Sequence, residues 1–136
     1  MALDSLAQAL LHARRLLGLP ASDADSAWRV RRLDTHGAYF IVHAAGHVVC
    51  MDAASGALLA STAAAHTTVH LTRDTALTAA ALGGKASAEL VWKPCAATLS
   101  IFDPLWFVAL GKDSVFIDQH GKRWPILPAA DAADPG

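Results

Sequence analysis

The sequence is poor in cysteine and in charge. Of its 136 residues, only two are cysteines and 17% are charged, and the formal net charge is −1. Two cysteines do not make a disulfide framework, so Cys50 and Cys95 are predicted to be free thiols, with a disulfide between them as the alternative. A near-neutral chain lacks the basic surface that binds phosphate backbones, which argues against nucleic acid as a partner.

Long apolar runs are also missing. No run reaches the length of about 18 residues that a membrane-spanning helix needs, so a membrane partner is not expected. The N-terminal segment does not match a signal peptide, because Asp4 lies where basic residues are needed and Gln8 and His12 interrupt the apolar stretch. We therefore expect a cytoplasmic protein.

Motifs typical of enzymes, cofactors and metals are absent from the sequence. His66 and His70 have the spacing of two ligands on a helix, but the Thr-Thr-Val between them favours a strand, where that spacing separates them. The Gly83-Gly84 pair follows a predicted helix instead of preceding one, so it does not match a phosphate-binding loop. The sequence predicts a protein that is not an enzyme and that binds neither a metal nor a cofactor.

Two stretches of the chain share one pattern. Residues 39–56 (YFIVHAAGHVVCMDAASG) and residues 105–121 (LWFVALGKDSVFIDQHG) each contain an apolar run, a short turn, a second apolar run ending in Asp, and a following Gly. Asp52 corresponds to Asp118, and both are predicted to start a turn. We interpret the two stretches as degenerate copies of one unit.

A helix is predicted before each stretch. Ser5 and Gln8 match the capping-box pattern, and Gly18 is typical of a helix end. The alanine-rich residues 73–82 predict a second helix, which Thr72 can cap.

The predicted fold class is α+β, because each helix is followed by consecutive strands joined by tight turns, as in antiparallel sheet. The prediction is two degenerate helix-plus-antiparallel-hairpin repeats, with helices covering one face of the sheet. The first repeat has four strands and the second four or five, the fifth lying at residues 98–102. Repeat 1 spans about residues 4–62 and repeat 2 about residues 72–127, within a single compact domain of residues 1–127. Residues 128–136 are predicted to form a flexible tail.

The predicted strands are apolar on both faces. Tyr39 and Ile41 face one side of their strand, and Phe40 and Val42 face the other. The face that no helix covers therefore still carries large apolar groups. Such a face must be covered by the other half of the chain, by a second copy or by another protein.

Four residues near the C-terminus form the predicted partner-binding set. Trp106 and Trp124 are of the type that dominates protein interfaces, and Pro125 beside Trp124 indicates an edge strand. Asp103 and Asp113 are predicted to be charge partners near them.

The segments VVCMDAASGALLA (residues 48–60) and VFIDQHGKRW (residues 115–124) resemble the closing hairpin of PepSY-like domains. Tandem units of this kind are similar to the β-lactamase-inhibitory proteins, which bind an enzyme with a concave sheet face. The second half, LWFVALGKDSVFIDQHGKRW, is also similar to small bacterial immunity proteins of polymorphic-toxin systems. The resemblance is carried by Asp52, Gly56, Trp106, Asp118 and Gly121.

The composition and the resemblance predict a small cytoplasmic protein-binding domain. Its specific form is an immunity protein, an inhibitor that occludes a cognate bacterial toxin. One alternative is a structural domain that self-associates as a homodimer through its apolar sheet face. Another is a small-ligand-binding domain with a pocket between helix and sheet, lined by Tyr39, His43 and His47.

Overall fold

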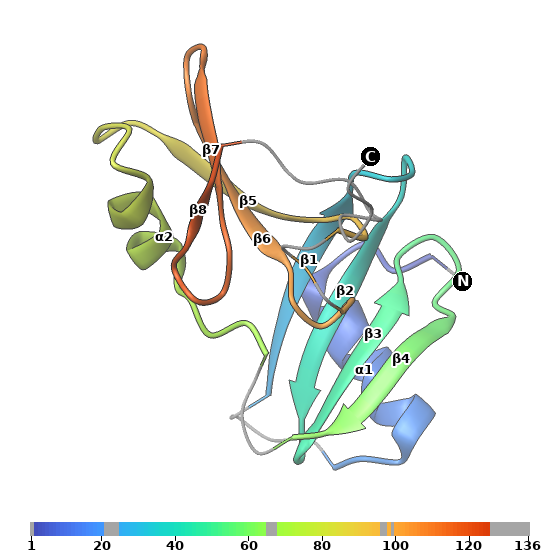
Figure 1. Cartoon of the computed structure of the whole chain (residues 1–136). Coiled ribbons are helices and arrows are strands. Elements are labelled where there is room, and N and C mark those ends of the chain that lie inside the picture. Colours follow the sequence, from blue (N-terminus) through green and yellow to red (C-terminus); the bar gives the residue numbers. More distant parts are fainter. Residues whose placement is uncertain (1, 21–24, 65–67, 96–97, 99, 126–136) are drawn as a thin grey trace. The chain divides into compact units, whose positions relative to one another are not determined.

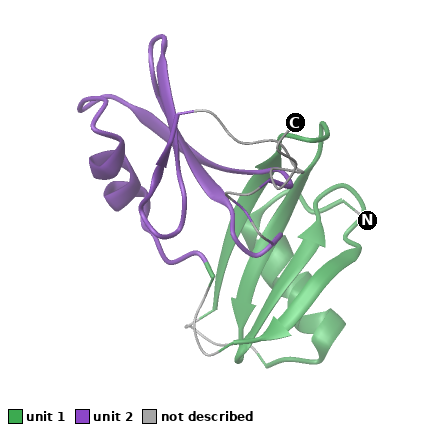
Figure 2. Cartoon of the chain, viewed as in Figure 1, with its two compact units in different colours: residues 1–68 green, residues 69–136 purple. Residues whose placement is uncertain are grey.

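Figure 1 shows the computed structural model of the chain. The structure describes residues 2–20, 25–64, 68–95, 98 and 100–125. The chain divides into two compact units, residues 1–68 and residues 69–136 (Figure 2).

The first unit contains one helix and four antiparallel strands. The strands follow the order β4-β3-β2-β1 across the sheet, so each is paired with its neighbour in the chain. The elements are α1 (Leu6–Leu17), β1 (Ser26–Arg32), β2 (Ala38–Ala44), β3 (His47–Asp52) and β4 (Leu58–Ala63).

The predicted ends of the first helix are confirmed. The Ser5 hydroxyl accepts a hydrogen bond from the Gln8 amide at 3.1 Å, and Gly18 ends the helix with a φ of 64°. The capping box is shifted by one residue, because the Gln8 side-chain oxygen accepts from the Asp4 amide at 2.6 Å and not from that of Ser5.

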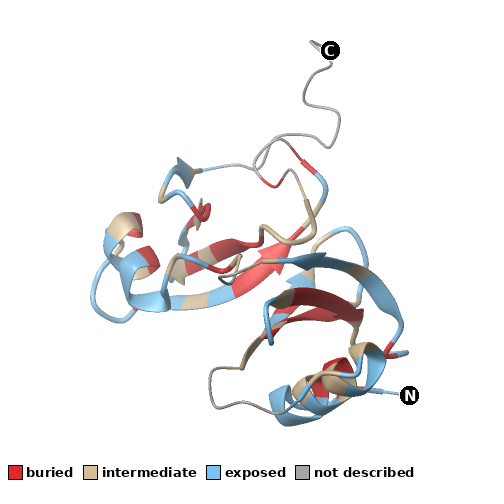
Figure 3. Cartoon of the chain, turned by 90° about the horizontal axis from the view of Figure 1, so that it is seen from below, coloured by how far each residue is buried: buried red, intermediate tan, exposed pale blue. Residues whose placement is uncertain are grey.

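Helix α1 packs on β1, β2 and β3 of the first unit. Ala9 and Ala13 are fully buried, and their small side chains let the helix lie close to the sheet. The core between helix and sheet consists of the buried residues Leu3, Ala9, Ala13, Phe40, Val42, Ala44, Val49 and Met51. Strand β2 is buried at six of its seven positions, consistent with its apolar side chains on both faces (Figure 3).

The second unit also has one helix and four antiparallel strands. The strands follow the order β5-β6-β7-β8. The elements are α2 (Arg73–Ala80), β5 (Ser87–Trp92), β6 (Leu105–Leu110), β7 (Asp113–Ile117) and β8 (Arg123–Trp124).

Helix α2 begins where the sequence predicts and ends early. The Thr72 hydroxyl caps it by accepting from the Thr75 amide at 3.2 Å. Ala81 ends the helix in the left-handed conformation with a φ of 55°, before the predicted end at residue 82. A Cβ atom on Gly83 would lie 3.1 Å from Leu110 Cδ2, so the chain leaving the helix passes close to β6.

The predicted fold class, α+β with repeated helix-plus-hairpin units, is wrong. The structure is mostly sheet, with two short helices that make up 18% of it and strands that make up 41%. The two units differ in their elements: α1 has 12 residues and α2 has eight, while β4 has six and β8 has two. The shared sequence pattern follows from turn chemistry, because an apolar strand, an Asp and a Gly recur wherever a strand turns back.

The predicted fifth strand at residues 98–102 is also wrong. Thr98 forms one isolated bridge with Cys95, and Ile101 and Phe102 lie in a turn. Asp103 closes this turn by donating its amide to Ser100 O at 3.0 Å. The predicted tail, residues 128–136, lies outside the described part of the chain.

Candidate protein-binding face

Three aromatic residues lie side by side on one face of the sheet in the second unit. The register pairs Phe107 with Phe116 and Phe116 with Trp124, so all three side chains point to the same face. The rings of Phe107 and Phe116 are 5.1 Å apart between centroids and inclined by 43°. All three residues are partly exposed. We call Phe107, Phe116 and Trp124 the aromatic row.

Helix α2 lies on the opposite face of this sheet. Leu110 lies close to Gly83, which follows the helix. Because side chains alternate along β6, Leu110 points to the same face as Trp106, and Phe107 points to the other face. The Trp106 indole also donates to the carbonyl of Leu71, just before the helix, at 2.8 Å. The aromatic row is therefore on the face of this sheet opposite α2.

Trp124 is held in place from two directions. Its indole Nε1 donates to Asp118 Oδ2 at 2.9 Å, and Lys122 Nζ lies 4.2 Å from the centroid of its ring system. Asp118 Oδ1 also accepts from the amides of His120 and Lys122, each at 2.9 Å. One buried carboxylate thus holds both the turn before β8 and the indole that follows it.

The turn role predicted for Asp118 is confirmed, but its bond to Trp124 was not predicted. Phe107 and Phe116 were also missed. Phe107 lies in the wholly apolar run LWFVAL, where alternation cannot show which face is open, whereas Phe116 falls on the same side of the alternation as the polar Ser114 and Asp118, a signal that the sequence did offer. The pairing of β6 with β7 could be predicted from the sequence. Gly111 and Lys112 form a two-residue turn between paired Leu110 and Asp113, and a turn of that length fixes the register.

The four predicted partner-binding residues do not lie together. Trp106 is only 8% exposed and lies on the face opposite Trp124, since it pairs with Ile117. Asp103 Oδ2 accepts from the Ser100 hydroxyl at 3.2 Å in the turn before β6. Asp113 is exposed at the tip of the β6–β7 hairpin. Of these four, only Trp124 belongs to the aromatic row.

Trp106 belongs to a buried network that ties the start of the second unit to its sheet. Gln119 is 8% exposed, and its side-chain oxygen accepts from the Leu71 amide at 2.9 Å. Its side-chain nitrogen donates to the Pro104 carbonyl, also at 2.9 Å. Leu71 therefore bonds through its carbonyl to Trp106 and through its amide to Gln119. These contacts give the two side chains a structural role.

The predicted ligand pocket of Tyr39, His43 and His47 is not formed. His47 pairs with Ala44, so it faces the side of the sheet opposite that of His43. Tyr39 is fully buried. His43 Nε2 lies 3.2 Å from the Ala64 carbonyl, and His47 Nδ1 lies 3.1 Å from that of Ala45. The register of the β2–β3 hairpin overturns this interpretation.

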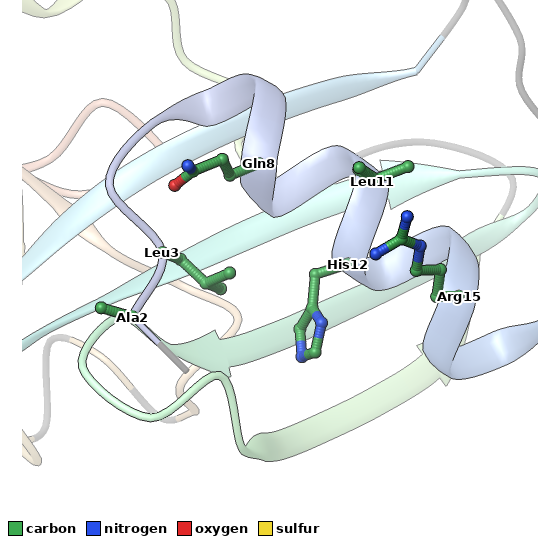
Figure 4. A pocket seen from close by; sticks show the side chains of 6 residues that line it. All are labelled: Ala2, Leu3, Gln8, Leu11, His12 and Arg15. Atoms are coloured by element: carbon green, nitrogen blue, oxygen red, sulfur yellow. The ribbon is translucent and has the colours of Figure 1, made fainter.

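A cavity of about 260 Å³ lies beside α1 in the first unit (Figure 4). It is lined by Ala2, Leu3, Gln8, Leu11, His12 and Arg15. His12 Nε2 lies 2.7 Å from the Gly56 carbonyl, while Gln8 and Arg15 point in other directions (Figure 4). The polar groups around this cavity do not converge on one point.

Within the described ranges, no group of three or more His, Cys, Asp or Glu side chains could hold a metal ion. Cys50 and Cys95 are both buried and neither forms a disulfide, as the prediction of thiols requires. No helix in the described part of the chain has the length and apolar character needed to cross a membrane.

Comparison of the chain with protein-family models, with curated proteins and with solved structures found no match.

Proposed function

We propose that this chain is a protein-binding module that engages its partner through the aromatic row. The observation that carries the proposal is the direct cross-strand alignment of three partly exposed aromatic residues on the face opposite α2. Contiguous apolar groups of this kind mark interaction sites, and aromatic side chains contribute most of the binding energy in such sites.

The environment of Trp124 favours tight binding. Its ring is already oriented by Asp118 and Lys122, so docking a partner on it restricts little further motion. Lys122 is exposed and its Nζ lies over the ring, so it provides a polar rim.

The specific form of the proposal is a cytoplasmic immunity protein that inhibits a cognate bacterial toxin by covering its active site. That specificity rests on the resemblance of residues 105–124 to such proteins. In this proposal the chain acts sterically, and the partner contributes the chemistry.

The test begins with capture of partners by the tagged protein from its native host, followed by identification of the bound proteins by mass spectrometry. A stoichiometric partner with a toxin domain supports the specific form. The purified partner is then titrated against Phe116→Ala, Trp124→Ala and, as a control, Phe102→Ala, which removes a partly exposed phenyl ring outside the aromatic row.

We expect each row variant to weaken binding by about 2 kcal/mol, or roughly thirtyfold, and the control to change it by less than about threefold. Unchanged affinity in both row variants would show that the partner binds elsewhere. A partner that lacks any toxin activity would overturn the inhibitor form and leave the docking face standing.

A further inference from the structure

Strand β4 is an exposed edge with little of the usual protection. It is the outermost strand of the first unit, and five of its six residues are exposed. Its sequence, LLASTA, contains no charged residue and no proline. Leu58 and Leu59 are 47% and 38% exposed. Natural sheets commonly block such edges with charges, prolines, bulges or very short strands, since an open edge pairs readily with another strand.

The outermost strand of the second unit shows the contrast. Strand β8 is only two residues long, it contains Arg123, and Lys122 and Pro125 flank it. Shortness, charge and proline therefore all protect that edge. In β4 the only such device is a bulge opposite Cys50 and Met51, which displaces Leu59 and leaves residues 60–63 regular.

The register shows which backbone groups of β4 point outward. The Ala64 amide donates to the Gly46 carbonyl at 2.9 Å, next to the pair His47–Ala63. That bond makes His47–Ala63 a non-hydrogen-bonded pair of the antiparallel ladder. By alternation, Ala63 and Ser61 direct their amides and carbonyls away from β3, whereas Thr62 directs its own toward β3.

We propose that β4 is a self-association site, at which two copies of the chain pair their β4 strands antiparallel about a twofold axis. In the register that uses both outward residues, Ser61 of each copy pairs with Ala63 of the other. This register forms two hydrogen-bonded pairs, and it places the two Thr62 residues opposite each other on the axis.

The chemistry of β4 selects a second copy as the occupant. A twofold contact brings each side chain near its own equivalent, so a charged edge would repel itself, and β4 carries no charge. Opposed threonines are also a favourable cross-strand pair. Because one strand pair is a small interface, we expect a weak, reversible dimer.

Sedimentation velocity of the intact protein over a range of concentrations is the first test. We expect the wild-type sedimentation coefficient to rise with concentration, and Thr62→Lys, which opposes two ammonium groups on the axis, to weaken dimerisation by at least about tenfold. The matched control is Thr78→Lys, the same change at an exposed threonine on α2, which should dimerise as the wild type does.

A cross-linking variant tests the register. Thr62→Cys places two thiols in a non-hydrogen-bonded pair, where Cβ atoms are close enough for a disulfide, whereas Thr78→Cys does not. The native Cys50 and Cys95 are buried and should not interfere. Under mild oxidation we expect a covalent dimer of Thr62→Cys alone.

A wild-type protein that stays monomeric at every concentration overturns the proposal. So does a dimer that tolerates Thr62→Lys and does not cross-link through Thr62→Cys. These outcomes are separate from those of the partner-binding test, because the aromatic row lies in the other unit and its variants should dimerise normally.

Discussion

Asp118 is a buried carboxylate that supports the aromatic row. Its two oxygens accept from the amides of His120 and Lys122 and from the Trp124 indole. A buried carboxylate with three donors is well satisfied, and each donor loses its partner if the side chain changes. The geometry of the binding face therefore depends on a residue that lies beneath it.

Replacing Asp118 tests this dependence. In Asp118→Asn one oxygen can still accept from the turn amides, but the new NH2 group cannot accept from Trp124 Nε1. We expect the free energy of unfolding, measured with urea and tryptophan fluorescence, to fall by about 1–2 kcal/mol, with weaker partner binding as well. Asp113→Asn, at the exposed hairpin tip, should change stability by less than about 0.5 kcal/mol. Equal effects of the two substitutions would contradict the assigned role of Asp118.

Asp52 is expected to make the stability of the protein depend on pH. The pKa of its carboxyl is lowered from the ordinary 3.8, first by the hydrogen bond from the Ser55 amide and then by that from the Ser55 hydroxyl. The Arg32 guanidinium, which bonds to Asp34 at 2.8 Å, likewise holds the pKa of Asp34 below its usual value.

Both carboxyls bind protons less readily in the folded state than in the unfolded state. Their stabilisation is fully present above the unfolded pKa of about 3.9 and is lost as the pH falls through the lower folded values. The urea concentration at the unfolding midpoint should therefore decrease as the pH is lowered from neutral to strongly acidic values. In Asp52→Asn this decrease should be smaller.

The contribution of Asp52 should stay below about 1 kcal/mol, because its side chain is partly exposed to solvent. Ser55→Ala removes the hydroxyl donor and keeps the amide donor, so it should flatten the profile less than Asp52→Asn does. A profile that is the same in all three proteins would show that this turn does not contribute to the acid sensitivity.

At the scale of elements, the ends of the two helices show how local chemistry limits them. Gly18 and Ala81 both end their helices in the left-handed conformation, with φ values of 64° and 55°. Glycine adopts this conformation without strain, whereas the Cβ of alanine opposes it. Helix α2 is therefore ended at a residue that is unfavourable there, directly after the buried Ala80.

Placing glycine at position 81 and alanine at position 18 should change the free energy of unfolding in opposite directions. Ala81→Gly is expected to stabilise the protein by about 1 kcal/mol, and Gly18→Ala to destabilise it by a similar amount. No atom lies within 4 Å of a Cβ built on Gly18, so its effect should be purely conformational. Thermal unfolding measures both. A loss of stability in Ala81→Gly would mean that the alanine side chain makes a contact worth more than the strain.

At the scale of the whole molecule, each of the two proposed surfaces lies within one compact unit. The aromatic row belongs to residues 69–136, and β4 belongs to residues 1–68. Effects of substitutions at separate sites that share no contacts normally add.

The two activities should therefore be separable by single substitutions. Trp124→Ala should lower partner affinity and leave the dimerisation constant within about twofold. Thr62→Lys should weaken dimerisation and leave partner affinity within about twofold. A double variant measured by titration and sedimentation should show the sum of the two free-energy changes. A large deviation from additivity would show that partner binding and self-association are coupled.

The sequence by itself determined the features that depend on neighbouring residues. Ser5 and Gly18 bound the first helix, and Asp118 starts its turn, because caps and turns are made by groups a few residues apart.

Only the tertiary structure decided the balance of helix and sheet, the open face and the open edge. Strands β2 and β6 are apolar at almost every position, so alternation could not separate Trp106, which is buried, from Phe107, which is partly exposed. Nothing in LLASTA indicates an outer strand, because that position depends on which strands pair across long distances in the sequence. The physical reason is the same in each case: local chemistry sets where an element starts and stops, and non-local packing sets which of its faces remains in contact with water.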